Sequence, residues 1–144
     1  MHILLQILTG SVILLFCTGL HLLITVELIR RLRLRSSSAA NLSWRANFRR
    51  TSIVFLVFLG SHTLHVYIWA FSISALGALE SASASIYFAL VTYTTVGYGD
   101  VTLGPEFRVF GAMASVSGIL LFGLTTAFLV SYLSKVIEAH ADRE

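Results

Sequence analysis

The chain has 144 residues, of which 56% are hydrophobic and only 12% are charged, and its formal net charge is +3. A soluble domain carries about 25% charged residues, so this composition excludes an ordinary soluble globular protein. Residues 1–26, 51–79 and 109–134 contain no Asp, Glu, Lys or Arg. Each run exceeds the roughly 20 residues that a helix needs to cross hydrocarbon. The sequence therefore predicts an all-α integral membrane protein with three transmembrane helices.

The first predicted span, residues 1–29, is followed by a basic segment, residues 30–50, which is expected to form a loop. Seven of the ten basic residues lie in this segment. Short loops rich in Arg stay in the cytoplasm, so the N-terminus is predicted outside and the C-terminus inside. Two interpretations of the charges remain open: they only fix the topology, or some also bind anionic lipid headgroups. The candidates for lipid binding are Arg30, Arg31, Arg33 and Arg35.

The second span is followed by residues 81–93, which favour a helix because they lack Pro and Gly. This helix is too short to cross a bilayer. We predict that it enters from the outer side and that the chain returns through the segment that follows. Membranes tolerate non-helical backbone at that depth only where it is buried in protein or lines a wet cavity. The negative C-terminal end of the helix then points inward and favours a cation.

The segment that follows, residues 94–100, has the sequence TTVGYGD and is similar to the ion-selective TVGYG loop of potassium channels, which implies that it coordinates an ion. An ion that leaves water needs replacement oxygen atoms, and an extended backbone with its carbonyls turned to one side supplies them. This arrangement needs conformations that are costly for residues with a Cβ atom, and the two glycines adopt them easily. Thr95 is placed to add its side-chain oxygen. Val96 and Tyr98 are predicted to point away from the ion and to support the loop from behind.

Residues 94–100 resemble the selectivity filter of tetrameric potassium channels. The similarity extends over residues 51–137, which resemble the pore domain of small prokaryotic channels; the first span is then one extra N-terminal transmembrane helix. The resemblance implies that K⁺ is coordinated by Thr95, Val96, Gly97 and Tyr98. It implies that the filter is supported by Thr94, Gly99, Asp100 and Tyr87.

The third span resembles the inner helix of simple bacterial channels through the patterns Gly118-Ile119, Phe122-Gly123-Leu124 and Thr126-Ala127. The resemblance implies that Gly118 is a hinge. Small residues also let transmembrane helices approach closely, so packing is the alternative role for this glycine, and packing is favoured for Gly123. By the same resemblance, the residues that face a water-filled cavity are Ile119, Phe122 and Thr126.

Two positions depart from the family pattern. Some bacterial channels carry a buried Glu behind the filter, where this chain has Val91, and Tyr87 and Phe88 stand where the family often has Trp. If Tyr87 donates its hydroxyl to Asp100, it tethers the outer end of the filter. Without that bond, slow collapse of the filter is favoured.

Four ionisable residues lie within the spans: His21, Glu27, His62 and His65. Counting at 1.5 Å per residue places His21 and His62 at nearly the same depth, so they are able to meet, and His62 and His65 share one helical face. Three interpretations remain: pH sensing by His21, His62 and His65, a metal site, or neutral histidines hydrogen-bonded between helices. Glu27 precedes Arg30 by three residues and is expected to reach the headgroups.

One loop supplies one quarter of a coordination shell, which predicts a homotetramer. The predicted function is passive, potassium-selective permeation in a prokaryotic cell membrane. K⁺ is the permeant ion, and no cofactor, nucleic acid or enzymatic activity is expected. The alternatives are a less selective cation channel and a non-conducting accessory subunit. Residues 138–144 are expected to form a short cytoplasmic tail.

Overall fold

The computed structural model describes residues 2–34 and 43–141, and every regular element in these two ranges is an α-helix. Three helices are long: α1 (Ile3–Leu34), α2 (Trp44–Ala75) and α4 (Arg108–Ala141). The fourth, α3 (Ala82–Tyr93), has 12 residues. The three long helices are apolar enough to cross a membrane, whereas α3 is too short. The prediction of an all-helical membrane protein is confirmed.

The long helices extend further than the charge-free runs. A helix of 32 residues is about 48 Å long, which exceeds the roughly 30 Å of hydrocarbon in a bilayer. The structure therefore differs from the expected loop over residues 30–50, because α1 continues to Leu34 and α2 already begins at Trp44. The basic residues near both ends of that segment therefore lie on helical turns that extend past the charge-free runs.

Glu27 is paired with the arginines that follow it on α1. Its carboxylate accepts hydrogen bonds from Arg30 (2.8 Å and 3.0 Å) and Arg31 (2.7 Å). The headgroup contact expected for Glu27 is thus accompanied by a local charge cluster at the end of the span. Lipid binding by Arg30 and Arg31 stays a prediction; the side chain of Arg33 and the whole of Arg35 lie outside the described residues.

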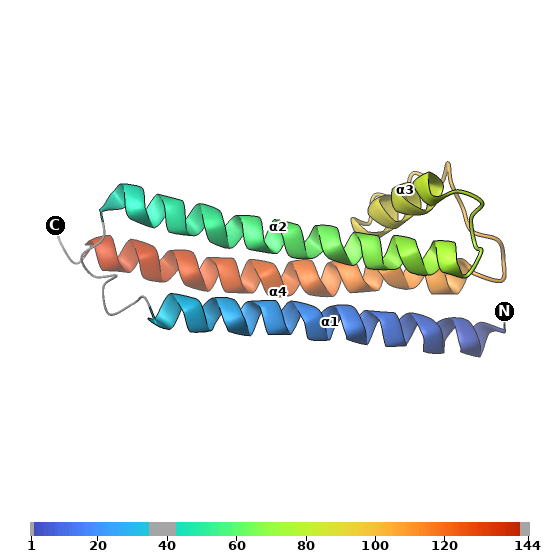
Figure 1. Cartoon of the computed structure of the whole chain (residues 1–144), viewed down its shortest axis with the longest axis horizontal. Coiled ribbons are helices and arrows are strands. Elements are labelled where there is room, and N and C mark those ends of the chain that lie inside the picture. Colours follow the sequence, from blue (N-terminus) through green and yellow to red (C-terminus); the bar gives the residue numbers. More distant parts are fainter. Residues whose placement is uncertain (1, 35–42, 142–144) are drawn as a thin grey trace.

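The helices are arranged around the pair formed by α2 and α4, which run side by side (Figure 1). The short α3 packs between one end of α2 and α4, while α1 lies on the other side and packs more extensively on α4 than on α2. The N-terminus of α1 lies at the same end of the molecule as α3 (Figure 1). The main core lies where α2, α3 and α4 meet and includes Trp69, Ile73, Tyr93 and Phe110.

A glutamine joins the N-terminal end of α1 to the first turn of α4. The side-chain oxygen of Gln6 accepts hydrogen bonds from the backbone amides of Val109 (3.0 Å) and Phe110 (3.3 Å), and Gln6 is buried. The first amides of a helix have no partner within the helix, so this contact satisfies two of them. One turn further, Gly10 allows the side chain of Met113 to approach closely. The two helices are therefore held in register.

Candidate functional site

The TTVGYGD segment begins directly on the last turn of α3. Ser81 caps the start of this helix by accepting a hydrogen bond from the amide of Ala84 (3.1 Å). At the other end, the amides of Val96 and Gly97 both donate to the carbonyl of Val91, at 3.0 Å and 3.2 Å. The segment is thus folded back onto the carbonyl end of the helix, where the negative end of the helix dipole lies.

The backbone of the segment alternates in handedness. Gly97 has φ +55° and Gly99 has φ +78°, the region predicted for both glycines. Thr95 also has a positive φ, +63°, which the sequence analysis did not predict. A β-branched residue in this region is an outlier that costs on the order of 1–3 kcal/mol and persists only where the surroundings impose it. Positive φ therefore recurs at every second residue from Thr95 to Gly99.

The C-terminal end of the segment is attached to α3. The hydroxyl of Tyr87 donates to Oδ2 of Asp100 at 2.7 Å, and Oδ1 of Asp100 accepts from the amide of Val101 at 3.1 Å. The hydrogen bond to Asp100 raises the pKa of Tyr87, so the phenol stays protonated and remains the donor at neutral pH. The structure thus contains the bond on which the tether hypothesis depends. Its role in conduction stays a prediction.

Replacing Tyr87 by Phe removes this bond while keeping the ring. We expect currents through the Tyr87→Phe variant to decline at least about threefold faster during sustained conduction, because a charge-assisted bond at the mouth is lost. The decline is measured in voltage-clamped planar bilayers. Tyr132→Phe is the matched control, since Tyr132 lies near the C-terminal end of α4 and its ring stacks on Phe128, away from α3. Equal rates of decline in the two variants would refute the tether.

Two residues of α4 contact the carbonyl end of α3. Ser115 donates to the carbonyl of Thr92 at 2.9 Å. A Cβ atom added at Gly118 would overlap the carbonyl oxygen of Tyr93. Gly118 is therefore a close-packing residue, the second of the two roles considered for it. Gly123, for which packing is favoured by sequence, has open space around it within one chain.

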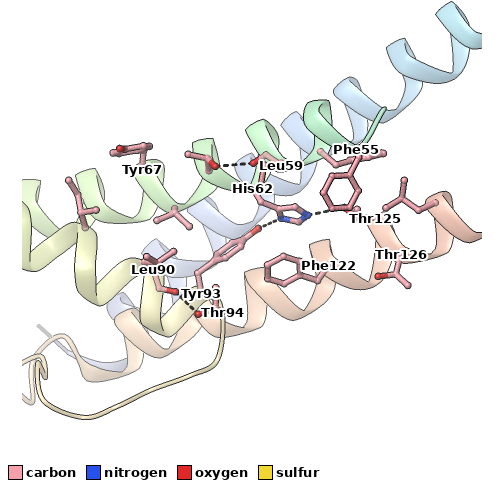
Figure 2. A pocket seen from close by; sticks show the side chains of 15 residues that line it. Phe55, Leu59, His62, Tyr67, Leu90, Tyr93, Thr94, Phe122, Thr125 and Thr126 are labelled. Atoms are coloured by element: carbon pink, nitrogen blue, oxygen red, sulfur yellow. Dashed lines mark hydrogen bonds between the residues drawn. The ribbon is translucent and has the colours of Figure 1, made fainter. Parts of the chain in front are cut away.

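The residues predicted to face a cavity lie exposed on α4 within one chain. Ile119 is 61% exposed and Phe122 is 39% exposed, and Thr126 is exposed too. Phe122 and Thr126 border a hollow of about 480 Å³ between α2, α3 and α4, shown in Figure 2. The lining of this hollow is mostly apolar, and His62 and Thr125 lie at its base. The exposure of Ile119, Phe122 and Thr126 leaves them available to line a water-filled cavity, and this role stays a prediction.

The three predicted histidines are brought together at the centre of the four helices. His21, His62 and His65 are buried, and the ring of His21 lies 5.4 Å from that of His62 and 5.5 Å from that of His65. The predicted meeting of His21 with His62 is confirmed. Tyr93 and Thr125, which the sequence analysis missed, complete the cluster through bonds to both ring nitrogens of His62 (Figure 2).

The histidine cluster is not arranged as a metal site. Across residues 2–34 and 43–141, no three His, Cys, Asp or Glu side chains are placed to hold a metal ion. Both nitrogens of His21 and of His62 face hydroxyl groups instead. The arrangement is that of hydrogen-bonded histidines between helices.

The chain shares its central region with known channels. The ion channel family matches residues 52–135. The "A-type voltage-gated potassium channel KCND3" of Rattus norvegicus and that of Homo sapiens are 35% identical over 66 residues, which are 44% of this chain and 10% of each relative. The "Potassium voltage-gated channel protein shk-1" of Caenorhabditis elegans is 46% identical over 52 residues, which are 35% of this chain and 10% of that protein. No solved structure matches the chain significantly.

The matched stretch spans about a tenth of the length of these relatives. The family match, in contrast, covers more than half of this chain and contains α3, the TTVGYGD segment and most of α2 and α4. The three long apolar helices agree with a membrane location. The protein therefore belongs to the potassium channel pore-domain family of ion channels.

Proposed function

We propose that the protein is a potassium-selective channel in which four copies of residues 94–100 form one filter around a common axis. The observation that carries this proposal is the alternation of positive φ at Thr95, Gly97 and Gly99. Alternating handedness turns successive carbonyls toward the same side of an extended backbone. A short row of oxygens then replaces the hydration shell of K⁺.

Four residues supply the coordinating groups. The carbonyls of Thr95, Val96, Gly97 and Tyr98 bind partly dehydrated K⁺, and the hydroxyl of Thr95 adds an oxygen at the inner end. Asp100 closes the outer mouth through its bond to Tyr87. Repulsion between ions at neighbouring sites lets K⁺ leave, so binding does not become a trap.

A tetramer completes the site, because one loop provides one quarter of each ring of oxygens. The loop's apolar side chains support this assembly: within one chain Val96 is 52% exposed and Tyr98 is 72% exposed. Side chains that brace a filter from behind need contacts, and here neighbouring subunits supply them. The apolar hollow beside Phe122 and Leu90 is covered in the same way by a second copy.

The orientation follows from the charges and the helix arrangement. The N-terminus of α1 and the helix α3 lie at one end of the molecule, and the basic ends of α1 and α2 lie at the other (Figure 1). With the basic end in the cytoplasm, the filter faces outside. Residues 51–137 then form the pore domain, with one extra helix before it and a cytoplasmic tail after it. The proposed location is a prokaryotic cell membrane.

Reversal potentials test the proposal. Purified protein is fused into planar bilayers with both ions on each side and opposite gradients of K⁺ and Na⁺, and the oligomer mass is measured in detergent. We expect a fourfold mass and a reversal potential close to the K⁺ equilibrium value. A reversal near zero would favour the less selective cation channel. A protein that carries no current but copurifies with a larger channel protein would favour an accessory subunit.

A further inference from the structure

A continuous chain of hydrogen bonds joins α1 to the carbonyl end of α3 through the centre of the molecule. His62 contacts the Tyr93 hydroxyl through Nδ1 (2.9 Å) and the Thr125 hydroxyl through Nε2 (3.0 Å). Thr125 also contacts Nε2 of His21 (3.1 Å), whose Nδ1 contacts the Ser61 hydroxyl (3.0 Å). Every member is at most 9% exposed. We call these five residues the polar relay: Tyr93, His62, Thr125, His21 and Ser61.

The relay has two complete directions, because each neutral histidine has one donor and one acceptor nitrogen and each hydroxyl both donates and accepts. In the first, Tyr93 donates to His62, which donates to Thr125. Thr125 then donates to His21, and His21 donates to Ser61. In the second, every bond is reversed, and the Tyr93 hydroxyl proton turns to Nδ1 of His65, 3.4 Å away. The tautomers of both relay histidines change together.

A proton taken from water is held better by a relay histidine than by His65. An imidazolium donates from both nitrogens and needs two acceptors. His21 and His62 face hydroxyl oxygens on both sides, whereas Nε2 of His65 has no hydrogen-bond partner among the described residues. The ring of Phe122 stacks on His62 at 4.3 Å and 24°, within the distance at which an aromatic face attracts a cation. The ring of Phe58 likewise lies 5.5 Å from that of His21, so His21 and His62 are both better proton acceptors than His65.

The relay holds one proton in each subunit. The rings of His21 and His62 lie 5.4 Å apart and share the hydroxyl of Thr125. Two like charges at that distance, away from water, repel strongly. A second proton is thus disfavoured as long as the first is bound.

We infer that His62 and His21 form a proton-binding site shared by α1 and the pore domain. A proton bound there acts on the filter by way of Tyr93 and lowers K⁺ permeation. This inference rests on the proposed channel function. It also gives α1 a role in permeation, since His21 of α1 is a member of the relay.

Protonation acts on the filter through the last residue of α3. When His62 donates from Nδ1, the Tyr93 hydroxyl accepts this bond of 2.9 Å and donates its own proton to His65 at 3.4 Å. Tyr93 then donates only the longer of its two bonds. Tyr93 directly precedes residues 94–100, and its carbonyl packs against Gly118. The imidazolium also lies behind Phe122, on the side predicted to face the cavity, where a positive charge disfavours K⁺. Both effects lower the flux.

The groups around the relay are neutral in the unprotonated state. Besides His21, α1 contributes the thiol of Cys17 to the same buried cluster. From α2 His65 faces the relay, and from α3 the titratable group is Tyr93. The side chains that α4 contributes are Thr125 and Phe122, which do not titrate. Protonation therefore introduces the local charge.

Flux measured over pH tests the inference. Purified tetramers are placed in K⁺-loaded liposomes with the same pH on both sides, and K⁺ release is followed with an electrode from about pH 8 to about pH 4, because burial disfavours the charged form of an imidazole and its titration then needs more acid. We expect the flux to fall at least about threefold with acidification. His62→Gln keeps a donor and an acceptor but does not titrate, so the acid-induced loss of flux should shrink to the part that His21 alone can cause. His2→Gln, at an exposed histidine, should keep the wild-type profile.

Each outcome decides between the two proposals. A selective but pH-independent flux, or a His62→Gln variant with the wild-type profile, overturns the proton site and leaves the channel function standing. Absence of K⁺ flux at every pH removes the channel function, and the proton site is then judged by ¹⁵N NMR of the imidazole nitrogens. There we expect His21 and His62 to take up one proton jointly, and Thr125→Val to change the nitrogen shifts of both rings. Independent titration, or rings unaffected by Thr125→Val, overturns the site.

Discussion

Gly97→Ala is expected to abolish potassium-selective permeation while the chain still inserts and assembles. Gly97 has φ +55°, and a residue with a Cβ atom costs roughly 1–2 kcal/mol in this left-handed region. Nothing lies within 4 Å of a Cβ atom built at this position, so the effect comes from the backbone and not from a clash within the chain. Relaxation to a negative φ turns one carbonyl in each subunit away from the axis. We expect the K⁺ to Na⁺ permeability ratio to fall at least about tenfold.

The control for this variant is the same exchange in a helix. Gly60 lies in α2 and has open space around it, so Gly60→Ala should keep the wild-type reversal potential. The measurement is the reversal potential in mixed K⁺ and Na⁺ gradients, with the oligomer mass checked for both variants. A normal preference for K⁺ in tetrameric Gly97→Ala would contradict the coordination scheme.

The filter was located from the sequence through its resemblance to the TVGYG loop of potassium channels, and the glycines within it predicted part of its backbone conformation. Gly97 and Gly99 are the residues that accept a positive φ without strain, and both have one. Thr95 was missed for the same reason: a β-branched residue predicts extended backbone, and only the surrounding fold imposes φ +63°. Extending the two-residue period of the glycines backwards was the one available signal.

The histidine cluster shows which contacts residue spacing along a helix can predict and which it cannot. The rise of 1.5 Å per residue gives depth, and depth alone brought His21 and His62 to one level. The partners Tyr93 and Thr125 depend on how α3 and α4 are rotated about their axes, which no local pattern determines. Hydroxyl residues are also frequent on all four helices, so their type alone does not mark a partner.

The ends of the helices were missed for an electrostatic reason. Charge-free runs mark the part of a helix that lies in hydrocarbon, whereas the helices themselves continue through the basic residues into the interface. Arg30 and Arg31 therefore lie on α1, where Glu27 pairs with both. The predicted topology rests on these charges, but the boundary between helix and loop does not follow from them.

Gly118→Ala is expected to disrupt the contact between α4 and α3. The added methyl group would overlap the carbonyl oxygen of Tyr93, and backbone atoms on both sides leave little room to adjust. Separating the helices also stretches the bond of 2.9 Å between Ser115 and the carbonyl of Thr92. Overpacking of this kind costs roughly 1–3 kcal/mol. We expect a lower thermal stability, a smaller tetramer fraction in size-exclusion chromatography and loss of K⁺ flux.

This variant separates the two roles considered for Gly118. Alanine favours a helix over glycine by about 1 kcal/mol, so loss of a mere hinge would leave assembly and stability intact or improved and would change only the opening of the channel. Loss of a packing contact lowers stability before any gating is measured. Gly123→Ala, five residues along the same helix with open space around it, is the matched control and should keep the wild-type tetramer. A stable Gly118→Ala tetramer with altered opening would return Gly118 to the hinge role and would show that α4 can move away from Tyr93 at little cost.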